Sequence, residues 1–252
     1  MRRYTTLFLL LPLAACGSDY SWGWYVVDPS TANGWRNIQF LASGLVYTIQ
    51  LSALAMAISV ALGLVVALPA LSQRRGWRLA NRTYVEVVRA VPILVLLLWV
   101  YYGLPVVLGI KLGVFAAGVI ALALSDSAFE AEIFRAGIQS IERGQQEAAK
   151  SLGLSWWQGF RLVILPQAIR RILPPLGNQF VYMLKMSSLV SVIGYTELTR
   201  RANELVVIEY RPLEIYTFLV VEYLALILVV SAGVRWLEHR MARQDRGKEA
   251  RT

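Results

Sequence analysis

The sequence has very few of the side chains that build disulfides, metal centres or soluble active sites. Among its 252 residues it has one cysteine, Cys16, and one histidine, His239. One cysteine excludes an intrachain disulfide, and a lone histidine in a basic tail argues against a histidine-based metal or catalytic centre. Charged residues make up 16% of the chain and hydrophobic residues 57%, whereas soluble domains carry about 25% charged residues. The shortage of charged residues predicts a membrane protein, and the length fits one domain. The scarcity of cysteine and histidine predicts that it has no metal site.

Acidic residues are also scarce relative to basic ones, 16 against 25, which leaves a formal net charge of +9. Net basic charge occurs in nucleic-acid-binding proteins, but also in the cytoplasmic loops of membrane proteins. The basic residues fall in the gaps between apolar runs and after the last run, which favours the second explanation, and we expect no nucleic-acid binding. The main groups are Arg74, Arg75, Arg78, Arg82 and Arg89, then Arg235, Arg240, Arg243, Arg246, Lys248 and Arg251.

Residues 1–16 have the pattern of a secretory signal, with two arginines, a short apolar run and small residues before Cys16. The run is too short to cross a bilayer, which takes about 20 residues. Leu13-Ala14-Ala15-Cys16 also resembles a bacterial lipoprotein cleavage box. Lipidation of Cys16 after cleavage is one expectation, and an uncleaved leader is the other. Residues 17–40 are polar and aromatic, which predicts an outside segment resting on the bilayer surface.

Five apolar stretches in the remaining chain are long enough, or nearly so, to cross about 30 Å of hydrocarbon as helices. Backbone groups in lipid must be paired within their own segment, so the predicted fold is all-α. The stretches are residues 41–68, 91–108, 114–134, 176–193 and 215–236. They define a transmembrane domain at 41–238, followed by a basic tail at 239–252.

The charges of the connecting loops predict the orientation of these spans. Loops 69–90 and 135–171 and the tail carry the basic excess, and five spans put all three on one side. By the positive-inside rule that side is the cytoplasm. We therefore expect the N-terminus outside and the C-terminus inside, which agrees with an exported N-terminal segment.

The loop at 137–166 has the strongest local signals. Residues 145–152 favour a short helix that ends at Gly153. Ser155 is a typical N-cap for a second helix, which we expect Pro166 to interrupt. A short helix with small residues on one face fits a groove on a partner protein. Taken alone, these residues fit equally well a helix that lies on the membrane surface.

Within this loop, Glu147-Ala148-Ala149, then Gly153, then Leu165-Pro166 resembles the coupling-loop signature of binding-protein-dependent ABC importer permeases. Val163 stands where the family usually has isoleucine. Three further stretches, 89–92, 131–138 and 187–194, are similar to the polar amino-acid branch of that family, the histidine, glutamine and glutamate type. The resemblance covers about residues 44–236 and implies the type I importer permease fold with five transmembrane helices.

The resemblance implies a permease subunit of an amino-acid importer in a bacterial inner membrane, surrounded by membrane lipid. Two ATP-binding subunits would dock on the loop, a second permease chain, identical or homologous, would complete the pathway, and a periplasmic protein would deliver an amino acid. The chain has no Gly-x-x-x-x-Gly-Lys-Ser/Thr loop, so we expect ATP hydrolysis on a separate subunit and no cofactor here. The implied ATPase-docking residues are Glu147, Ala148, Ala149, Gly153, Leu154, Trp156 and Trp157.

Four ionisable residues fall inside or near the predicted spans, where charge is costly and suggests function. They are Asp126, Glu130, Lys185 and Glu222. A Lys185–Glu222 ion pair and a bond from Glu222 to a partner chain both fit the sequence, and purely structural pairing is the simpler explanation. We expect Asp126 and Glu130 to approach the cytoplasmic boundary.

Two other functions fit parts of the sequence. An ion-coupled secondary amino-acid carrier would use Asp126, Lys185 and Glu222 as coupling groups, although such carriers usually contain a repeated half and none is found. A membrane scaffold or lipoprotein anchored at Cys16 would need no buried charges in its later spans.

The resemblance also bears on the substrate. Family members that carry cationic amino acids often place carboxylates at the positions of Gln179 and Met186, and neither residue is charged here. A cationic group favours an anionic partner in a dry site. This departure argues against arginine or lysine and leaves glutamine, glutamate, aspartate or a broader polar range, unless the partner chain supplies the charges. The expected substrate-pathway residues are Gln179, Lys185, Met186, Ser187, Ser188, Glu222 and Asp126.

Overall fold

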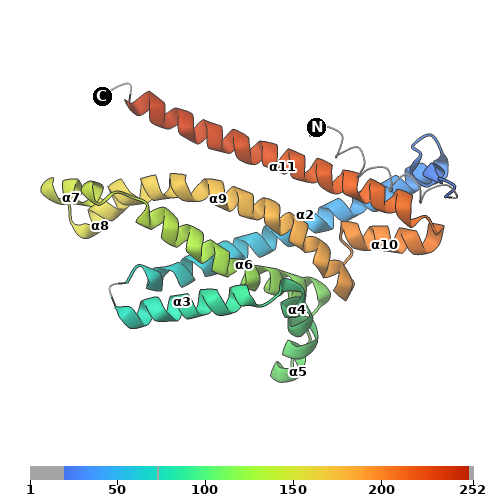
Figure 1. Cartoon of the computed structure of the whole chain (residues 1–252), viewed down its shortest axis with the longest axis horizontal. Helices are drawn as coiled ribbons and strands as arrows, with labels where there is room; N and C mark the ends of the chain where they lie inside the picture. The colour runs from blue at the N-terminus through green and yellow to red at the C-terminus, as the bar shows by residue number, and fades with distance from the viewer. Residues whose placement is uncertain (1–19, 73, 250–252) are drawn as a thin grey trace, which may run out of the picture.

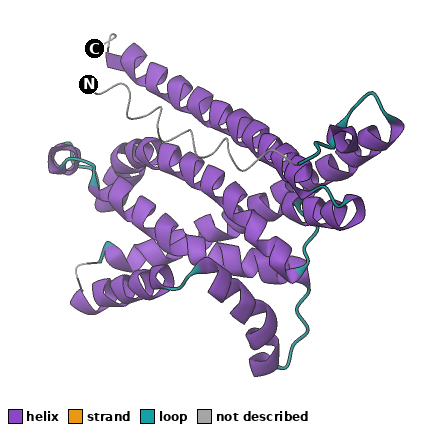
Figure 2. Ribbon diagram, turned by 45° about the vertical axis from the view of Figure 1, so that its right-hand side comes forward, coloured by secondary structure: helices purple, strands orange, loops and turns teal. Residues whose placement is uncertain are grey.

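The computed structural model describes residues 20–72 and 74–249, with side chains as far as Met241. Within these residues the regular structure is helical, with no strand. The long helices lie side by side, and shorter ones gather at the ends of the bundle (Figures 1 and 2). The elements are η2 (Trp24–Val27), α2 (Ala32–Ala70), α3 (Arg75–Ala90), α4 (Ile93–Leu98), η3 (Trp99–Gly103), α5 (Leu104–Leu108), α6 (Val114–Gln139), α7 (Arg143–Ser151), α8 (Trp156–Gly159), η4 (Phe160–Ile164), α9 (Leu165–Met186), η5 (Ser187–Ile193), α10 (Leu198–Glu209) and α11 (Pro212–Glu249). The predicted signal segment and Cys16 lie outside the described residues.

Helix α2 is longer than the apolar run that predicts it, and it begins inside the predicted surface segment at 17–40. It starts after Thr31, whose side chain accepts a hydrogen bond from the Gly34 amide at 3.0 Å, as an N-cap does. One face of α2 carries small buried residues at helical spacing, so α6 packs closely along it. These residues are Gly44, Thr48, Ser52, Ala55, Ser59, Gly63 and Ala67.

Helix α3 lies where the sequence predicted a cytoplasmic loop at 69–90. The side-chain amide of Asn81 donates to the Val66 carbonyl of α2 at 2.6 Å. The Tyr84 hydroxyl lies 2.8 Å from Ser127 Oγ of α6. The connection between the first two predicted spans is therefore largely helical, and these polar side chains hold α3 along the bundle by bonding to neighbouring helices.

The predicted span at 91–108 is helical from Ile93 to Leu108, and a sharp bend separates it from α3. Helix α3 and the helical segment at 93–108 meet at 92°. Pro92 explains the break, because its ring disfavours helical backbone at the preceding residue, and Val91 is extended with φ −85° and ψ 123°. The segment projects from the bundle (Figure 1), and Val106 and Val107 near its end are 82% and 70% exposed.

The structure shows no helix interruption at Pro166, and the helix that contains the predicted span start at 176 begins earlier. Helical structure runs without a break from α8 through η4 into α9. The π-helical turn η4 closes where the Leu165 amide donates to the Phe160 carbonyl. Pro166 then falls in the first turn of α9, where its missing N–H costs little. Helix α9 continues through two further prolines, Pro174 and Pro175, to Met186.

Two buried carboxylates hold the end of the bundle that lies opposite α7. Glu197 accepts hydrogen bonds from two amides in the first turn of α10 and from the Tyr223 hydroxyl of α11, at 2.8 to 2.9 Å. Glu214, in the first turn of α11, accepts from the Tyr20 hydroxyl and the Gly23 amide. These bonds tie the segment before α2 to α10 and α11.

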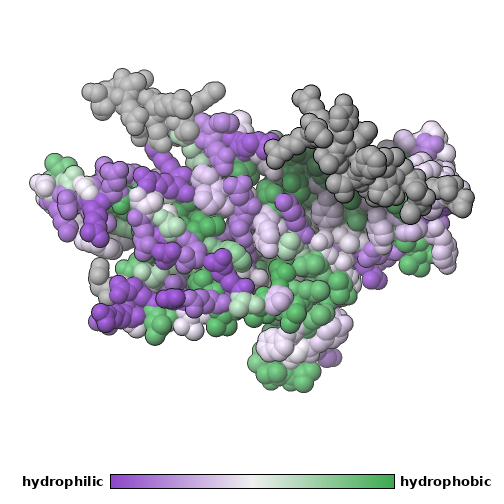
Figure 3. All heavy atoms as spheres, viewed as in Figure 1, coloured by the Kyte–Doolittle hydropathy of each residue, from purple (hydrophilic) through white to green (hydrophobic). Residues whose placement is uncertain are grey.

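By length and composition, three helices in the described part of the chain are able to cross a membrane, namely α2, α6 and α11 up to Met241. The number is four if α3 and its bent continuation form one span. Hydrophilic atoms gather where α7, α8 and the start of α3 lie, and hydrophobic atoms cover α4 and α5 (Figure 3). The start of α3, the α7–α8 region and the C-terminal end of α11 all lie at one end of the molecule (Figure 1).

Candidate functional site

The first candidate site is the helical hairpin formed by α7 and α8, residues 143–159, which we call the docking hairpin. Gly153 ends α7 as predicted, with a left-handed φ of +76° that favours glycine. Its amide donates to the Lys150 carbonyl at 2.9 Å, and the Leu154 amide donates to the Ala149 carbonyl at 3.1 Å. The turn therefore follows the local sequence signals closely.

Ser155 starts the second helix with a complete capping box. The Gln158 amide donates to Ser155 Oγ at 3.3 Å, and the Ser155 amide donates to Gln158 Oε1 at 2.9 Å. Trp156 stacks on Phe160 with ring centroids 5.6 Å apart, and Trp157 stacks on the same ring at 6.0 Å. Both tryptophans remain largely exposed, at 74% and 59%, so the hairpin presents a broad aromatic surface.

The docking hairpin has a close contact between its own two helices and a hydrogen bond to the bundle. Ala149 is buried against α8, and a Cβ at Gly159 would lie 3.3 Å from its Cβ. Gln167 of α9 donates to the side chain of Gln145 at 3.2 Å. Of the predicted docking residues, Ala149 thus faces α8 and Leu154 is half-buried, whereas the others are exposed. They are Glu147, Ala148, Gly153, Trp156 and Trp157.

The sequence prediction missed one apolar side chain on the exposed surface of the hairpin. Leu152 is 80% exposed and lies between the end of α7 and Gly153. Its place directly after the helix and before a left-handed glycine is the signal that identifies it.

The second candidate site is a buried set of polar side chains between α2, α6 and α9, which we call the carboxylate cluster: Ser59, Asp126, Glu130 and Gln179. Ser59 Oγ donates to one oxygen of Asp126 at 2.6 Å, and the Gln179 amide donates to the other. Glu130 follows one turn later on α6, with its Cβ against Gly63. The sequence singled out three of these residues but could not bring them together, and it missed Ser59.

Burial in the carboxylate cluster is nearly complete. Asp126 is 4% exposed and Glu130 is 0% exposed, and neither Glu130 oxygen has a hydrogen-bond partner. Asp126 is the thirteenth of 26 residues in α6, so it lies halfway along the helix. The helix extends five residues past the predicted span, and the expected approach of Asp126 and Glu130 to the cytoplasmic boundary stays a prediction.

The remaining predicted pathway residues lie on α9 and α11. Lys185 is exposed on α9 and forms no ion pair with Glu222 in the part of the chain that the structure describes. Glu222 is half-buried on α11, with one carboxyl oxygen unpartnered. Ser187 and Ser188 each donate their hydroxyl to a backbone carbonyl three residues earlier, at 2.8 Å. Of the two interpretations of Glu222, the ion pair with Lys185 is thus not formed among the described side chains, and a bond to a partner chain stays a prediction.

Four side chains on α9 share one exposed face with Lys185 or border it. Asn178 and Tyr182 are exposed at helical spacing from Lys185, and Gln179 and Met186 are partly buried at the edge of that face. Gln179 thus connects the exposed face of α9 with Asp126 behind it.

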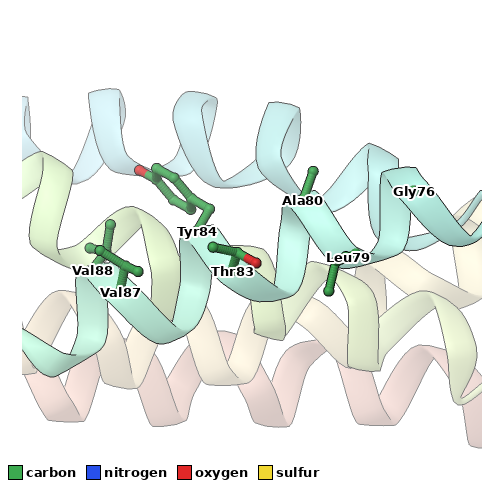
Figure 4. Close-up of a pocket in the computed structure, with 7 residues that line it drawn as sticks. All are labelled: Gly76, Leu79, Ala80, Thr83, Tyr84, Val87 and Val88. Carbon is green, nitrogen blue, oxygen red and sulfur yellow. The ribbon is translucent and has the colours of Figure 1, made fainter.

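A surface groove of about 580 Å³ lies along α3 and contains none of the predicted site residues. Its lining comes from this one helix, and Tyr84 turns away from it toward the neighbouring helix (Figure 4). The lining residues are Gly76, Leu79, Ala80, Thr83, Tyr84, Val87 and Val88. The groove is separate from both candidate sites.

Comparison with known families gives one match across most of the described helices. Residues 59–243 match the family of binding-protein-dependent transport system inner membrane components. The chain belongs to this family.

Relatives in this family are similar over almost their whole length. The glutamine transport system permease protein of Escherichia coli K12 is 39% identical over 211 residues, 82% of this chain and 95% of that protein. The arginine transport system permease protein of Bacillus subtilis is 33% identical over 208 residues, 82% of this chain and 95% of that protein. These matches favour the ABC importer over the ion-coupled secondary carrier.

Solved structures support the same fold. An amino acid ABC transporter crystallised with histidines has a chain 43% identical to this one, with a TM-score of 0.76, covering 82% of this chain and 96% of that one. An inward-facing methionine ABC transporter has a TM-score of 0.65 at 18% identity, covering 82% and 96% of the two chains. The fold is therefore that of type I ABC importer permeases.

Proposed function

We propose that this permease forms the translocation pathway of an ATP-driven amino-acid importer and receives its energy from separate ATP-binding subunits. The relatives named for glutamine and arginine transport support an amino-acid substrate. The permease family supports a multi-pass membrane protein. The chain itself has no nucleotide-binding loop of the Gly-x-x-x-x-Gly-Lys-Ser/Thr type, so ATP hydrolysis belongs to the partner.

Five crossings of a bacterial inner membrane complete the proposal: α2, α3 with its bent continuation, α6, α9 with η5, and α11. Basic residues concentrate at the end that carries the docking hairpin, which makes that end cytoplasmic. The segment before α2 and helix α10 then face the periplasm, where a binding protein delivers the amino acid. A second permease chain completes the pathway, and each chain docks one ATP-binding subunit.

The observation that carries this proposal is the docking hairpin. It projects one exposed surface with Glu147, Leu152, Trp156 and Trp157 at the basic end of the bundle. Ala149 packs against α8 and holds the two helices of the hairpin together, and Gln167 of α9 donates to Gln145 of α7. Exposed tryptophans are typical of protein interfaces, and the unbroken helical connection through η4 lets the hairpin transmit force to α9.

The test is substrate-stimulated ATP hydrolysis by the complex of permease, ATP-binding subunit and binding protein. Glu147→Arg reverses a charge on the docking surface, and we expect at least about a ten-fold loss of stimulation, because a like-charge or unpaired contact in an interface costs several kcal/mol. Glu86→Arg reverses a charge on the exposed side of α3 and is the matched control. Unchanged stimulation in the Glu147 variant would contradict docking through this hairpin.

The proposed pathway follows the exposed face of α9. Lys185 supplies a positive charge for the α-carboxylate of an amino acid, and Gln179 lies six residues earlier, about 9 Å away along a helix. A polar amino acid that spans these two side chains is held at both ends. Met186, Ser187, Ser188 and Glu222 stay part of the proposed pathway, although both serine hydroxyls are already bonded to backbone.

A further inference from the structure

The carboxylate cluster changes the expected substrate. Gln179 and Met186 are uncharged, which by itself argues against a cationic substrate. The structure puts the Asp126 carboxylate of α6 directly against the Gln179 amide. Resting on the proposed function, we propose that Asp126, with Glu130 behind it, is the anionic group that recognises a positively charged side chain of the transported amino acid.

The two carboxyl groups lack a cation of their own. They lie one helical turn apart on α6, almost fully buried, and among the described residues no basic side chain forms an ion pair with either. Buried charge is costly unless it is paired. A guanidinium or ammonium group would supply the missing positive partner, because hydrogen bonds between ionised partners are stronger than neutral ones.

The geometry gives a cationic group a way to reach Asp126. Gln179 is partly exposed at the edge of the open face of α9. When its side chain turns away, one oxygen of Asp126 becomes free while Ser59 continues to donate to the other at 2.6 Å. An amino acid whose carboxylate lies at Lys185 then directs a long basic side chain toward Asp126.

Bonds within the cluster do not explain Glu130. Ser59 and Gln179 both donate to Asp126, and the two oxygens of Glu130 are left without donors. Gly63 lets α2 approach α6 closely at Glu130, because a Cβ at that position would clash with the Glu130 Cβ. Two buried carboxyl groups this close cannot both be ionised without a cation beside them, so the pair carries one negative charge until a cationic group binds.

The test is equilibrium binding of radiolabelled arginine, glutamine and glutamate to the purified complex of permease and ATP-binding subunit. The binding protein is left out, so that its own preference does not contribute. We expect Asp126→Asn to weaken arginine binding at least about ten-fold while glutamine binding changes less than about three-fold. Glu86→Gln removes a carboxylate from exposed α3 and is the matched control. Equal arginine affinity in Asp126→Asn and wild type would overturn the proposal.

If the melting temperature shows that Asp126→Asn does not fold, a second variant tests the same proposal. Gln179→Ala removes the side chain in front of Asp126, so we expect arginine binding to be kept or strengthened and glutamine binding to fall. A parallel loss of both ligands overturns the proposal. Wild-type binding of glutamine without arginine also overturns it but leaves the proposed function intact. Binding of no amino acid, with no stimulated ATP hydrolysis, defeats the proposed function itself.

Discussion

The docking hairpin and the carboxylate cluster are built in opposite ways. The hairpin is held mostly by contacts between residues close in sequence, such as the capping box of Ser155 and Gln158, and it exposes its apolar side chains. The cluster joins residues 53 and 67 positions apart, as in Gln179–Asp126 and Ser59–Asp126, and it buries its polar ones. The proposed docking surface is thus encoded locally, and an interior polar site depends on the packing of three helices.

The largest expected effect on stability is at Gly63, where α2 packs against Glu130 of the carboxylate cluster. Gly63→Ala would bring a Cβ within 2.4 Å of the Glu130 Cβ and 3.0 Å of the Ala131 amide nitrogen. We expect a loss of about 1 to 3 kcal/mol of stability from overpacking, despite the better helix propensity of alanine. The measurement is thermal unfolding of the purified permease in detergent.

Gly233→Ala is the matched control for this prediction. Gly233 also lies within a long helix, α11, and a Cβ there would meet nothing within 4 Å. We expect this variant to be neutral or slightly stabilising, because alanine has the higher helix propensity. If both variants have the same melting temperature, the close approach of α2 to α6 does not hold the cluster together.

The comparison also explains which features were predictable from sequence. Gly153 and Ser155 were identified correctly because turn and cap signals act within a few residues. The position of α3 was not predicted, because it depends on a distant segment: Asn81 bonds to α2. The predicted break at Pro166 was wrong, because a π-helical turn directly before it continues the helix into α9. The contact of Asp126 with Gln179 could not be predicted from the sequence, because no local pattern sets the register of α6 against α9.

An intermediate effect is expected at the turn of the docking hairpin. Gly153 has φ +76°, a conformation that costs a residue with a Cβ about 1 to 2 kcal/mol. Gly153→Ala should therefore loosen α7 against α8 and increase hydrogen exchange across residues 143–158, with no change in global melting. Gly144→Ala, in open space at the start of α7, serves as the control. A fall in global melting temperature would show that the hairpin is not an independent local unit.

The smallest effect is expected at the cap of α8, where it tests how local the hairpin is. Ser155→Ala removes the acceptor of the Gln158 amide and should cost about 1 kcal/mol of local stability. Ser155→Asp restores an acceptor at the same position and should recover most of this loss. The expected signature is faster amide exchange in residues 156–160 for the alanine variant alone, with stimulated ATP hydrolysis reduced less than about three-fold. If the effect extends to α6 or α2, the hairpin and the carboxylate cluster are coupled more tightly than their separate contacts indicate, and the contrast between them fails.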